Sequence, residues 1–308
     1  MEVKLFKPED CIEDMLYDLE NGKPKGSTTY IDEIDQFWTW RKGELNIFTA
    51  YANEGKSKMI RFLSLIKSLE EGWKFAFNSP EDFPVKEMYD DIIHTLSGRT
   101  TDKLNIYNEL ISKEEYLKCY NIIKDKFFFS YIKPPNNTIE NAIKEFTKIH
   151  EEYGIDGFIF DPMMKFQKSK NAPERVEEYS TYIVTLLSDF ARVTNTSVHL
   201  IVHQLTPQRE EGQKNYRKPN MYSARGGGQI ADGSDNVLIL QRPEYATNKT
   251  STKVLFGSDK IKNQKLVGIP GEVLFEYNRK TNRYVRLETG EDLYNFDKFM
   301  KDKKRMLL

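Results

Sequence analysis

The sequence has few cysteines, no long apolar run and no apolar leader at its start. Cys11 and Cys119 are its only cysteines and lie far apart without metal-ligand spacing, so we expect two free thiols in a reducing compartment. No apolar run approaches the roughly 20 residues of a membrane span, and residues 1–11 lack the apolar core of a secretory signal. We therefore expect a cytoplasmic protein with no membrane partner.

A surplus of charge of one sign is also missing. Lys and Arg total 46 against 47 Asp and Glu, a formal net charge of −1. This balance excludes a protein that holds nucleic acid through bulk positive charge, so any nucleic acid must be bound by local loops. The chain does have 39% hydrophobic and 13% aromatic residues over 308 positions, which is ample for a buried core in one large domain or two small ones.

Strand-like and helix-like apolar segments alternate along the chain. After a short apolar strand that ends at residue 50, strands are predicted at 73–78, 127–132, 155–161, 197–203, 236–241 and 253–261. Helices are predicted between the earlier strands, at 57–71, 85–97, 138–152 and 174–193. This alternation predicts a largely parallel sheet covered on both faces by helices. Residues 271–287 predict a β-hairpin that turns at Lys280, Thr281 and Asn282.

Both ends of the chain differ from this alternating pattern. Residues 8–22 predict an amphipathic helix that stops at Gly22 and has an apolar face in need of a partner, formed by Cys11, Ile12, Met15, Leu16 and Leu19. A Gly/Pro/Ser connector and a second short helix within residues 31–38 follow. We therefore divide the chain into an N-terminal helix with its linker (1–25), a main domain (26–290) and a C-terminal tail (291–308) that forms a short helix or a docking peptide.

The most informative motif is a glycine-lysine-serine turn between a predicted strand and a predicted helix. Residues 50–57 read AYANEGKS, which matches the phosphate-binding pattern G-x-x-x-x-G-K-[ST] except at Ala50. Gly55 lets backbone N–H groups approach a phosphate, and the positive end of the following helix favours negative charge. Lys56 would neutralise the terminal phosphates and Ser57 would ligate Mg²⁺. The pattern predicts a nucleoside triphosphate site, whose cofactor-binding residues also include Asn53, Glu54 and Lys58.

Carboxylates follow two further strands, where such an ATPase needs them. Asp161 ends an apolar strand, a position from which a carboxylate orients Mg²⁺ through its water shell. Glu81 follows another strand and could polarise the attacking water. Asp82 stands next to it as a competitor for this role.

Polar residues at two other strands are candidates for contact with phosphate. His203 or Gln204, at a strand tip, could sense the γ-phosphate. His199 shares a strand face with His203, but a third ligand is missing from the sequence around them, which disfavours zinc. Lys260 and Lys262 could reach a phosphate or face solvent.

The order of these motifs resembles that of the hexameric replicative helicases with a RecA-like core, of the DnaB type, and particularly their phage and mitochondrial Twinkle-like branch. The resemblance extends over about residues 8–287. It rests on the phosphate turn followed by SPEDFP, YGIDGFIFDP, LIVHQL, ARGGGQIADGSDNVLIL with QR, and the KIK strand closing with GEVLFEYNRKTNRYV. It implies an α/β RecA-like P-loop NTPase core with a mostly parallel central sheet, a C-terminal β-hairpin and a short N-terminal helix that serves oligomerisation.

The resemblance also implies an activity and roles for individual residues. It implies an ATP-dependent DNA helicase with Mg²⁺ as cofactor, which translocates 5′ to 3′ on single-stranded DNA as a ring. Glu81 would activate water, either His203 or Gln204 would sense the γ-phosphate, and Arg242 would lie near the nucleotide. Relatives differ in which sensor residue they use, so these two stay open.

A cationic pair is the largest departure from the family pattern. Lys260 and Lys262 occupy the K-x-R pair that the adjacent subunit donates, so Lys262 stands where the arginine finger is expected. An ammonium group cannot make the planar two-pronged contact of a guanidinium. Hydrolysis activated by the neighbour would then be slower, or Arg225 or Arg279 would supply the finger.

Two polar segments after strands have the composition of loops that track a phosphate backbone. They are residues 163–175 and 206–225, both rich in Lys or Arg and interrupted by Gly, Pro or Asn. We expect single-stranded DNA to be bound there by Lys165, Lys168, Lys170, Arg209, Lys214, Arg217, Lys218 and Arg225.

These inferences predict a homo-oligomer, expected to be a hexameric ring, that acts in the cytoplasm of a bacterial host and is encoded by a phage. Primase and DNA polymerase are candidate partners; a primase would be a separate protein, because the sequence has no primase zinc site or Toprim segment. One alternative is a RecA- or RadA-like recombination ATPase, which forms filaments. Another is a non-unwinding ATP-dependent loader or ring subunit, a reading that Lys262 favours.

Overall fold

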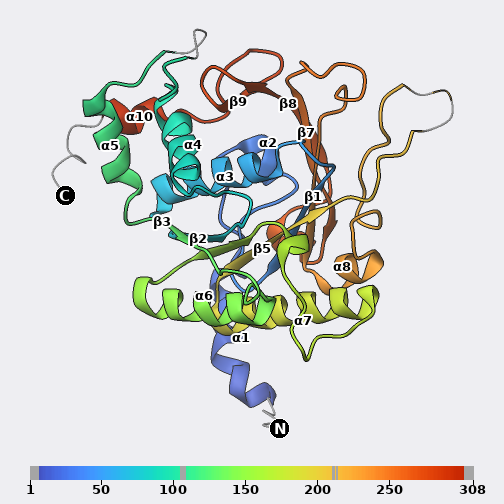
Figure 1. Ribbon diagram of the computed structural model, residues 1–308. Helices are drawn as coiled ribbons and strands as arrows, with labels where there is room; N and C mark the ends of the chain where they lie inside the picture. Colours follow the sequence, from blue (N-terminus) through green and yellow to red (C-terminus); the bar gives the residue numbers. More distant parts are fainter. Residues whose placement is uncertain (1–6, 105–108, 210–211, 213, 302–308) are drawn as a thin grey trace.

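The computed structural model describes residues 7–104, 109–209, 212 and 214–301, in which one sheet crosses the body with helices on both faces (Figure 1). The strands are β1 (Leu45–Ala50), β2 (Phe75–Asn78), β3 (Phe127–Ser130), β4 (Gly157–Phe160), β5 (Ser197–His203), β6 (Asn236–Gln241), β7 (Lys253–Ile261), β8 (Glu272–Asn278) and β9 (Arg283–Arg286). The longer helices are α1 (Ile12–Asn21), α3 (Lys56–Glu71), α4 (Lys86–Ser97), α5 (Lys113–Ile123), α6 (Ile139–Tyr153) and α7 (Val176–Thr194). The short ones are η1 (Pro8–Cys11), α2 (Asp32–Asp35), η2 (Met163–Lys165), α8 (Gly228–Gly233), α9 (Gln264–Val267) and α10 (Asp297–Lys301).

The strand order is β3-β2-β4-β5-β1-β6-β7-β8-β9. Neighbouring strands from β3 to β6 are parallel, whereas β6, β7, β8 and β9 pair antiparallel. The predicted mostly parallel α/β sheet with a C-terminal hairpin is therefore confirmed. Asn282, in the hairpin turn, has a φ of +58°, a left-handed conformation that asparagine tolerates.

Side chains of the central strand alternate between two apolar layers, as the two-residue period of a strand requires. Phe48 of β1 packs into the layer that contains α3 and α4, whereas Leu45 and Ile47 pack into the layer of α6 and α7. Figure 1 shows these two pairs of helices on opposite faces of the sheet. Strands buried on both faces explain why β1 reads as a continuous apolar run.

Among the longer helices, α5 lies outside the sequence prediction. Cys119 and Ile123 are its only buried residues, so its apolar stripe is sparse. The signal that the sequence did contain is at its start, where the Ser112 hydroxyl accepts a hydrogen bond from the Glu115 N–H at 3.2 Å. Serine followed three residues later by glutamate is the sequence pattern of a capping box.

The described part of the segment assigned to a C-terminal tail, residues 291–301, packs against the main domain. Leu293, Tyr294, Phe296 and Phe299 are buried in the layer of α3 and α4. Phe296 lies 5.7 Å from Phe62 of α3, ring centre to ring centre. The apolar side chains that suggested a docking peptide are thus docked on their own chain.

The N-terminal helix α1 projects from the body (Figure 1) and buries none of its residues. Exposed fractions of its apolar side chains run from 46% for Ile12 to 78% for Leu19. The apolar face predicted at residues 8–22 therefore has no partner within the described part of the chain. No helix among the described residues is long and apolar enough to cross a membrane.

Candidate nucleotide-binding site

The phosphate turn joins β1 to α3 at the carboxyl edge of the parallel strands. Ala50 is the last residue of β1, in extended conformation, so alanine takes the place of the first motif glycine without strain. Asn53 and Gly55 have φ values of +62° and +94°, left-handed conformations that favour asparagine and glycine. Lys56 then begins α3, whose N-terminal N–H groups face the turn.

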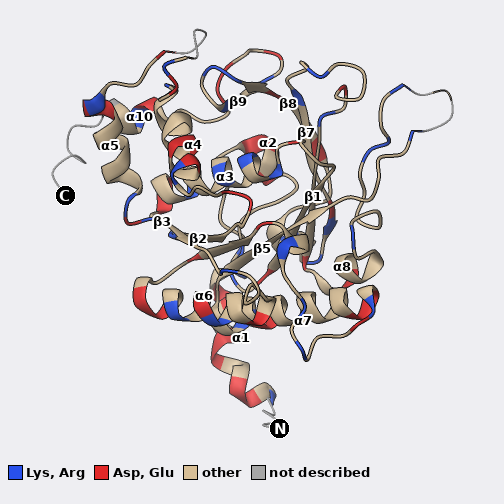
Figure 2. Cartoon of the chain, in the orientation of Figure 1, with Lys and Arg blue, Asp and Glu red and all other residues tan. Residues whose placement is uncertain are grey.

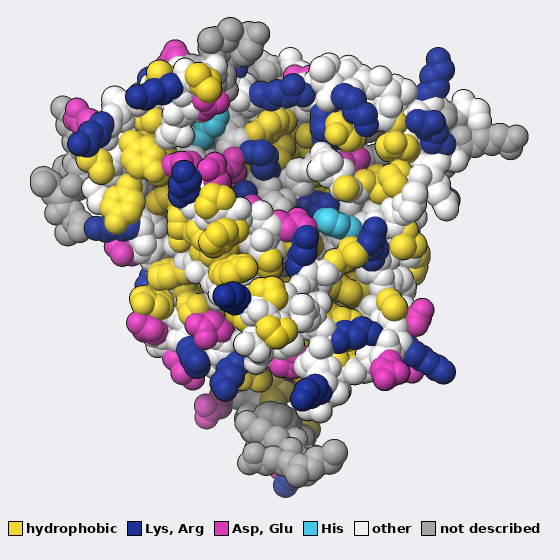
Figure 3. Space-filling model, in the orientation of Figure 1, with side chains coloured by type: hydrophobic (Ala, Val, Ile, Leu, Met, Phe, Trp, Pro, Cys, Tyr) yellow, Lys and Arg dark blue, Asp and Glu magenta, His cyan; other side chains and the backbone are white. Residues whose placement is uncertain are grey.

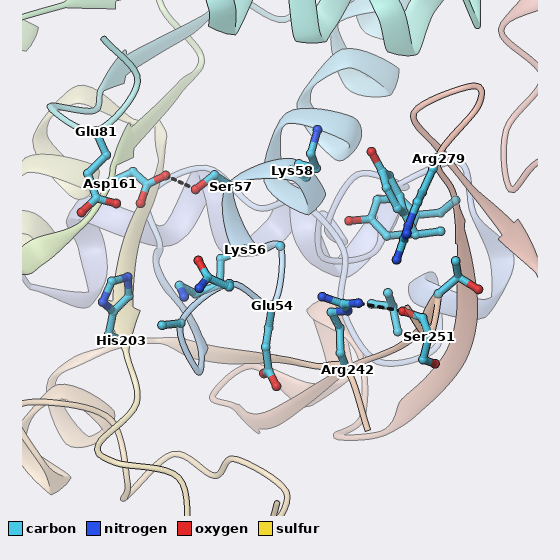
Figure 4. Close-up of a pocket in the computed structure, with 17 residues that line it drawn as sticks. Glu54, Lys56, Ser57, Lys58, Glu81, Asp161, His203, Arg242, Ser251 and Arg279 are labelled. Carbon is cyan, nitrogen blue, oxygen red and sulfur yellow. Dashed lines mark hydrogen bonds between the residues drawn. The ribbon is translucent and has the colours of Figure 1, made fainter. Parts of the chain in front are cut away.

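Strand register brings the other predicted residues to the same edge. Ala50 pairs with His203 on the neighbouring strand β5, and Asn78 of β2 pairs with Phe160 of β4. The segments that follow these strands therefore leave the sheet side by side. They enclose a cavity of about 560 Å³ (Figure 4), whose lining includes Ala52, Asn53, Glu54, Gly55, Lys56, Ser57, Lys58, Glu81, Asp161, His203 and Arg242.

Ser57 and Asp161 meet at this cavity, where the Ser57 hydroxyl donates a hydrogen bond to the Asp161 carboxylate (Figure 4). Burial raises the pKa of Asp161 to about 6, while the bond from Ser57 and the nearby cations Arg61 and Lys56 act in the opposite direction. A hydroxyl and a carboxylate are hard oxygen ligands of the kind that Mg²⁺ takes. The described residues contain no group of three or more His, Cys, Asp or Glu side chains that could hold a metal ion.

Lys56 is buried beside the turn, where its ammonium donates to the carbonyl oxygens of Tyr51 at 3.0 Å and Ala50 at 3.4 Å. Burial lowers its pKa, while Asp161, Glu54 and Glu81 favour the charged form. Glu54 is itself buried, and burial raises the pKa of its carboxyl to about 7. At neutral pH a carboxyl with this pKa is about half protonated, so Glu54 would repel a phosphate less than a fully charged carboxylate does.

The structure separates Glu81 from its competitor. The Asp82 carboxylate is paired with Arg61 of α3, away from the cavity lining. Glu81 lines the cavity with a partly exposed side chain, and its carboxylate lies 3.3 Å from the Lys165 ammonium. The geometry therefore favours Glu81 as the carboxylate that can reach a water inside the cavity.

The two sensor candidates also differ in position. His203 lines the cavity on the side of Glu81 and Asp161 (Figure 4). Burial and the Lys56 charge lower its pKa, which favours a neutral imidazole. The Gln204 amide nitrogen instead donates to Thr49 and to the Asn220 carbonyl, at 3.0 and 2.9 Å, and its oxygen accepts from Ser223. Gln204 is therefore a support of the following loop, outside this cavity.

His199 belongs to the aromatic core, not to the cavity. Its ring is fully buried at 5.0 Å from Trp40 and 6.0 Å from Trp38, ring centre to ring centre. Its Nε2 lies 3.0 Å from the Ser197 hydroxyl. Burial lowers the pKa of His199 to about 3, so the ring stays neutral.

The opposite end of the cavity is formed by the antiparallel strands. Arg242 follows β6 and donates to the carbonyls of Ser251 at 2.7 Å and Lys249 at 3.1 Å. Its guanidinium lies 4.1 Å from the ring centre of Tyr245. The lining here also contains Arg279, the alternative finger, and a set of residues that the sequence prediction did not assign to the nucleotide, namely Ser251, Thr252, Val254, Tyr277 and Tyr284.

Lys260 and Lys262 lie far from this cavity. Strand β7 starts beside the cavity at Val254 and runs antiparallel to β6, so Lys262 lies about 25 Å away at roughly 3.3 Å per residue. Lys260 is engaged by the carbonyls at the end of α8, of Ala231 at 2.7 Å and Ser234 at 2.8 Å. Lys262 pairs with the buried Asp235 at 3.0 Å and keeps 55% of its side chain exposed. Neither lysine can reach a ligand in its own chain's cavity.

The two predicted DNA loops leave the same edge as the cavity, after β4 and β5. Several of the described loop cations have a partner within the chain. Besides Lys165, Lys168 donates to the Glu174 carbonyl, and Lys218 pairs with Glu272 at 2.5 Å. Arg225 donates to the Met164 sulfur. Lys170 and Lys214 are exposed, as are Arg209 and Arg217. Lys and Arg are interspersed with Asp and Glu over most elements (Figure 2), and the face around the site carries side chains of both signs (Figure 3).

Fold and cavity together define the class of the protein: a P-loop NTPase whose phosphate turn lies at the carboxyl edge of a nine-stranded, mostly parallel sheet. Within that class, the chain belongs to the family described as DnaB-like helicase C terminal domain, whose sequence profile matches residues 26–286. The resemblance inferred from the order of motifs is thereby confirmed.

Individual relatives agree with this assignment. The chain is 24% identical over 294 residues to the Twinkle homolog protein, chloroplastic/mitochondrial, of Arabidopsis thaliana, a match that covers 91% of this chain and 39% of the relative. It is 25% identical over 237 residues to a probable plasmid replicative DNA helicase of Chlamydia psittaci, covering 76% of this chain and 49% of the relative. The chain thus spans less than half the length of these relatives.

Solved structures match the fold. A solved ATPase domain superposes with a TM-score of 0.75 at 16% identity, over 92% of this chain and all of that domain. The structure of a DnaB-like replicative helicase, solved to describe its interactions with primase, superposes with a TM-score of 0.73 at 15% identity. That match covers 92% of this chain and 69% of the helicase.

Proposed function

We propose that the chain is the ATP-driven motor of a replicative DNA helicase, which translocates 5′ to 3′ on single-stranded DNA as a homo-oligomeric, expected hexameric, ring. The observation that carries the proposal is the division of the catalytic groups. The cavity gathers Lys56, Ser57, Glu81 and Asp161 in one chain, whereas Lys262, the residue at the finger position, follows the opposite end of β7. A second copy would supply this cation.

Eight residues that line the cavity have a proposed task toward ATP. Lys56 neutralises charge on the terminal phosphates, and Ser57 with Asp161 would hold Mg²⁺, which shields the phosphate oxygens when bound. Glu81 accepts a proton from the attacking water, and His203, a neutral imidazole beside it, hydrogen-bonds the γ-phosphoryl group. Arg242, Tyr277 and Tyr284, at the opposite end, are available to the base.

The DNA role of the loops 163–175 and 206–225 is supported by their origin at the same sheet edge. Lys165 links the first loop to the site directly, because its ammonium pairs with Glu81 at 3.3 Å. A phosphate of single-stranded DNA that attracts Lys165 would release the Glu81 carboxylate. Primase and DNA polymerase are proposed partners; a primase interaction is named for the DnaB-like helicase structure to which this chain is similar.

Unwinding of a forked duplex tests the proposed function. We expect the protein to release a labelled strand only with ATP and Mg²⁺, and only when the fork carries a 5′ single-stranded tail. Glu81→Gln protein serves as the matched control for binding without turnover. Strand exchange without fork unwinding would instead indicate a recombination ATPase, and ATP hydrolysis without either reaction would indicate a loader or ring subunit.

Assembly is proposed to depend on α1, because its apolar face is exposed on its own chain. Deleting residues 1–22 should leave a folded domain that still binds ATP but no longer oligomerises, since burial of Met15 and Leu19 on a neighbour would supply the driving force. Light scattering measures the particle mass, and Leu19→Asp is a milder variant with the same expected direction. Unchanged oligomers in both variants would contradict this role of α1.

A further inference from the structure

Tyr51, the second residue of the phosphate turn, has no task in the chemistry above, yet its side chain is only 7% exposed. Its backbone belongs to the site. The Tyr51 carbonyl accepts the hydrogen bond from Lys56 at 3.0 Å, and its N–H donates to the Glu54 carboxylate at 3.3 Å. The peptide groups of Tyr51 are thus held by the lysine that would bind phosphate and by a buried acid of the same turn.

The side chain of Tyr51 points the other way, into the loop 206–225. Its hydroxyl donates to the Arg217 carbonyl at 3.2 Å. Its ring meets the ring of Tyr216 edge to face, with centres 6.0 Å apart. Tyr216 in turn lies 5.4 Å beneath the Arg209 guanidinium, and its carbonyl accepts from Gln241 of β6 at 3.2 Å. One residue therefore touches both the lysine of the nucleotide site and a loop proposed to bind DNA.

Tyr51 contacts the loop 206–225 at a point where the two sides of the loop are hydrogen-bonded to each other. The Arg217 N–H donates to the Gln208 carbonyl at 2.8 Å, and nearer the sheet the Leu205 N–H donates to the Ser223 carbonyl at 2.9 Å. Gln204 and Ala224 form an antiparallel bridge below them. Residues 216–217 are therefore joined through this pairing to Gln208, which precedes Arg209.

We propose that Tyr51 is a positioning residue that couples the phosphate site to the loop 206–225, an inference that rests on the proposed DNA role of that loop. Phosphate and the Tyr51 carbonyl compete for the same Lys56 ammonium, so a bound nucleotide changes how the Tyr51 peptide is held. The ring and hydroxyl pass this change to Tyr216 and Arg217. Linkage makes the effect reciprocal: DNA on the loop changes nucleotide affinity by the same factor.

The test is the affinity for fluorescent oligo-dT, measured by anisotropy with and without a non-hydrolysable ATP analogue and Mg²⁺. The ratio of the two affinities is the coupling factor, expected to be of order tenfold in the wild type. Tyr51→Phe removes only the bond to the Arg217 carbonyl and should reduce that factor by about threefold to fivefold. Tyr216→Leu, outside the phosphate turn, should reduce it at least as much.

Tyr89→Phe is the matched control, because the Tyr89 hydroxyl donates to a backbone carbonyl, that of Phe127, at 3.3 Å and far from both loops. It should keep the wild-type coupling factor. A wild-type factor in Tyr51→Phe and Tyr216→Leu, or an equal loss in Tyr89→Phe, would overturn the inference while leaving the helicase proposal intact. Wild-type protein that binds no oligo-dT in either state would contradict the DNA role itself, and the inference with it.

Discussion

Glu81→Gln is expected to reduce DNA-stimulated ATP hydrolysis by about 10² to 10⁴, the usual contribution of a positioned general base, while nucleotide binding stays near wild type. Glutamine fills the same space in the cavity but cannot take a proton from water. Glu81 is the carboxylate of its segment that lines the cavity, since Asp82 is paired with Arg61. Steady-state phosphate release and titration with a fluorescent ATP analogue separate turnover from binding.

Two further variants serve as comparisons for Glu81→Gln. Lys56→Ala should lose hydrolysis through a different route, because charge on the terminal phosphates is no longer neutralised. Asp82→Asn should mainly weaken the contact between the Glu81 segment and α3, because its partner is the buried Arg61. Wild-type turnover by Glu81→Gln together with loss of turnover in Asp82→Asn would assign the base to Asp82.

Lys262→Ala is expected to reduce DNA-stimulated hydrolysis by about 10³, the lower end of the contribution of arginine fingers in related P-loop enzymes, because a lysine supplies the charge with only one contact direction. Nucleotide affinity should remain nearly unchanged, because Lys262 lies far from the cavity of its own chain. The rise per residue along β7 puts the separation at about 25 Å. Lys262→Arg should retain activity or raise it. Parallel hydrolysis and binding titrations measure both quantities.

Lys260→Ala is a useful comparison for Lys262→Ala, because it removes the other lysine of the pair. Lys260 donates to carbonyls at the end of α8, so its loss should lower the stability of that helix end more than it lowers turnover. Normal hydrolysis by Lys262→Ala would transfer the finger to another cation. Arg279 lines the cavity of its own chain. Arg225 lies next to that cavity, because its backbone N–H donates to the carbonyl of His203, a lining residue. Either arginine would therefore act within one chain.

The sequence predicted those parts of the site that depend on short segments and parallel strands. The phosphate turn is local, and Asp161, Glu81 and His203 follow parallel strands whose carboxyl ends must share an edge. Strands β5, β6 and β7 have the bounds predicted for them. Six or more residues of continuous or alternating apolar pattern, bounded by polar turns, were sufficient for this.

The other end of the cavity could not be predicted in this way. Thr252 and Tyr277 lie 25 positions apart in the chain and are brought together because β7 and β8 pair antiparallel, in a register that no single residue reveals. The different positions of His203 and Gln204 also needed the fold, because Ser223 and Asn220, in the following loop, hydrogen-bond Gln204 outside the cavity. Tyr51 gave no signal at all, since the Arg217 carbonyl that its hydroxyl contacts lies 166 residues further along the chain.

The proposed ring motor depends on one claim: ATP is hydrolysed between two copies of the chain. Mixing two inactive variants tests this claim most directly. Lys56→Ala retains Lys262 but has a disabled cavity, whereas Lys262→Ala retains the cavity but lacks the finger. In mixed rings, the Lys262→Ala cavity can receive the intact Lys262 of a Lys56→Ala neighbour. We predict that the DNA-stimulated ATPase rate of an equimolar mixture rises well above the rates of both single variants. A mixture no more active than their average would contradict a shared site.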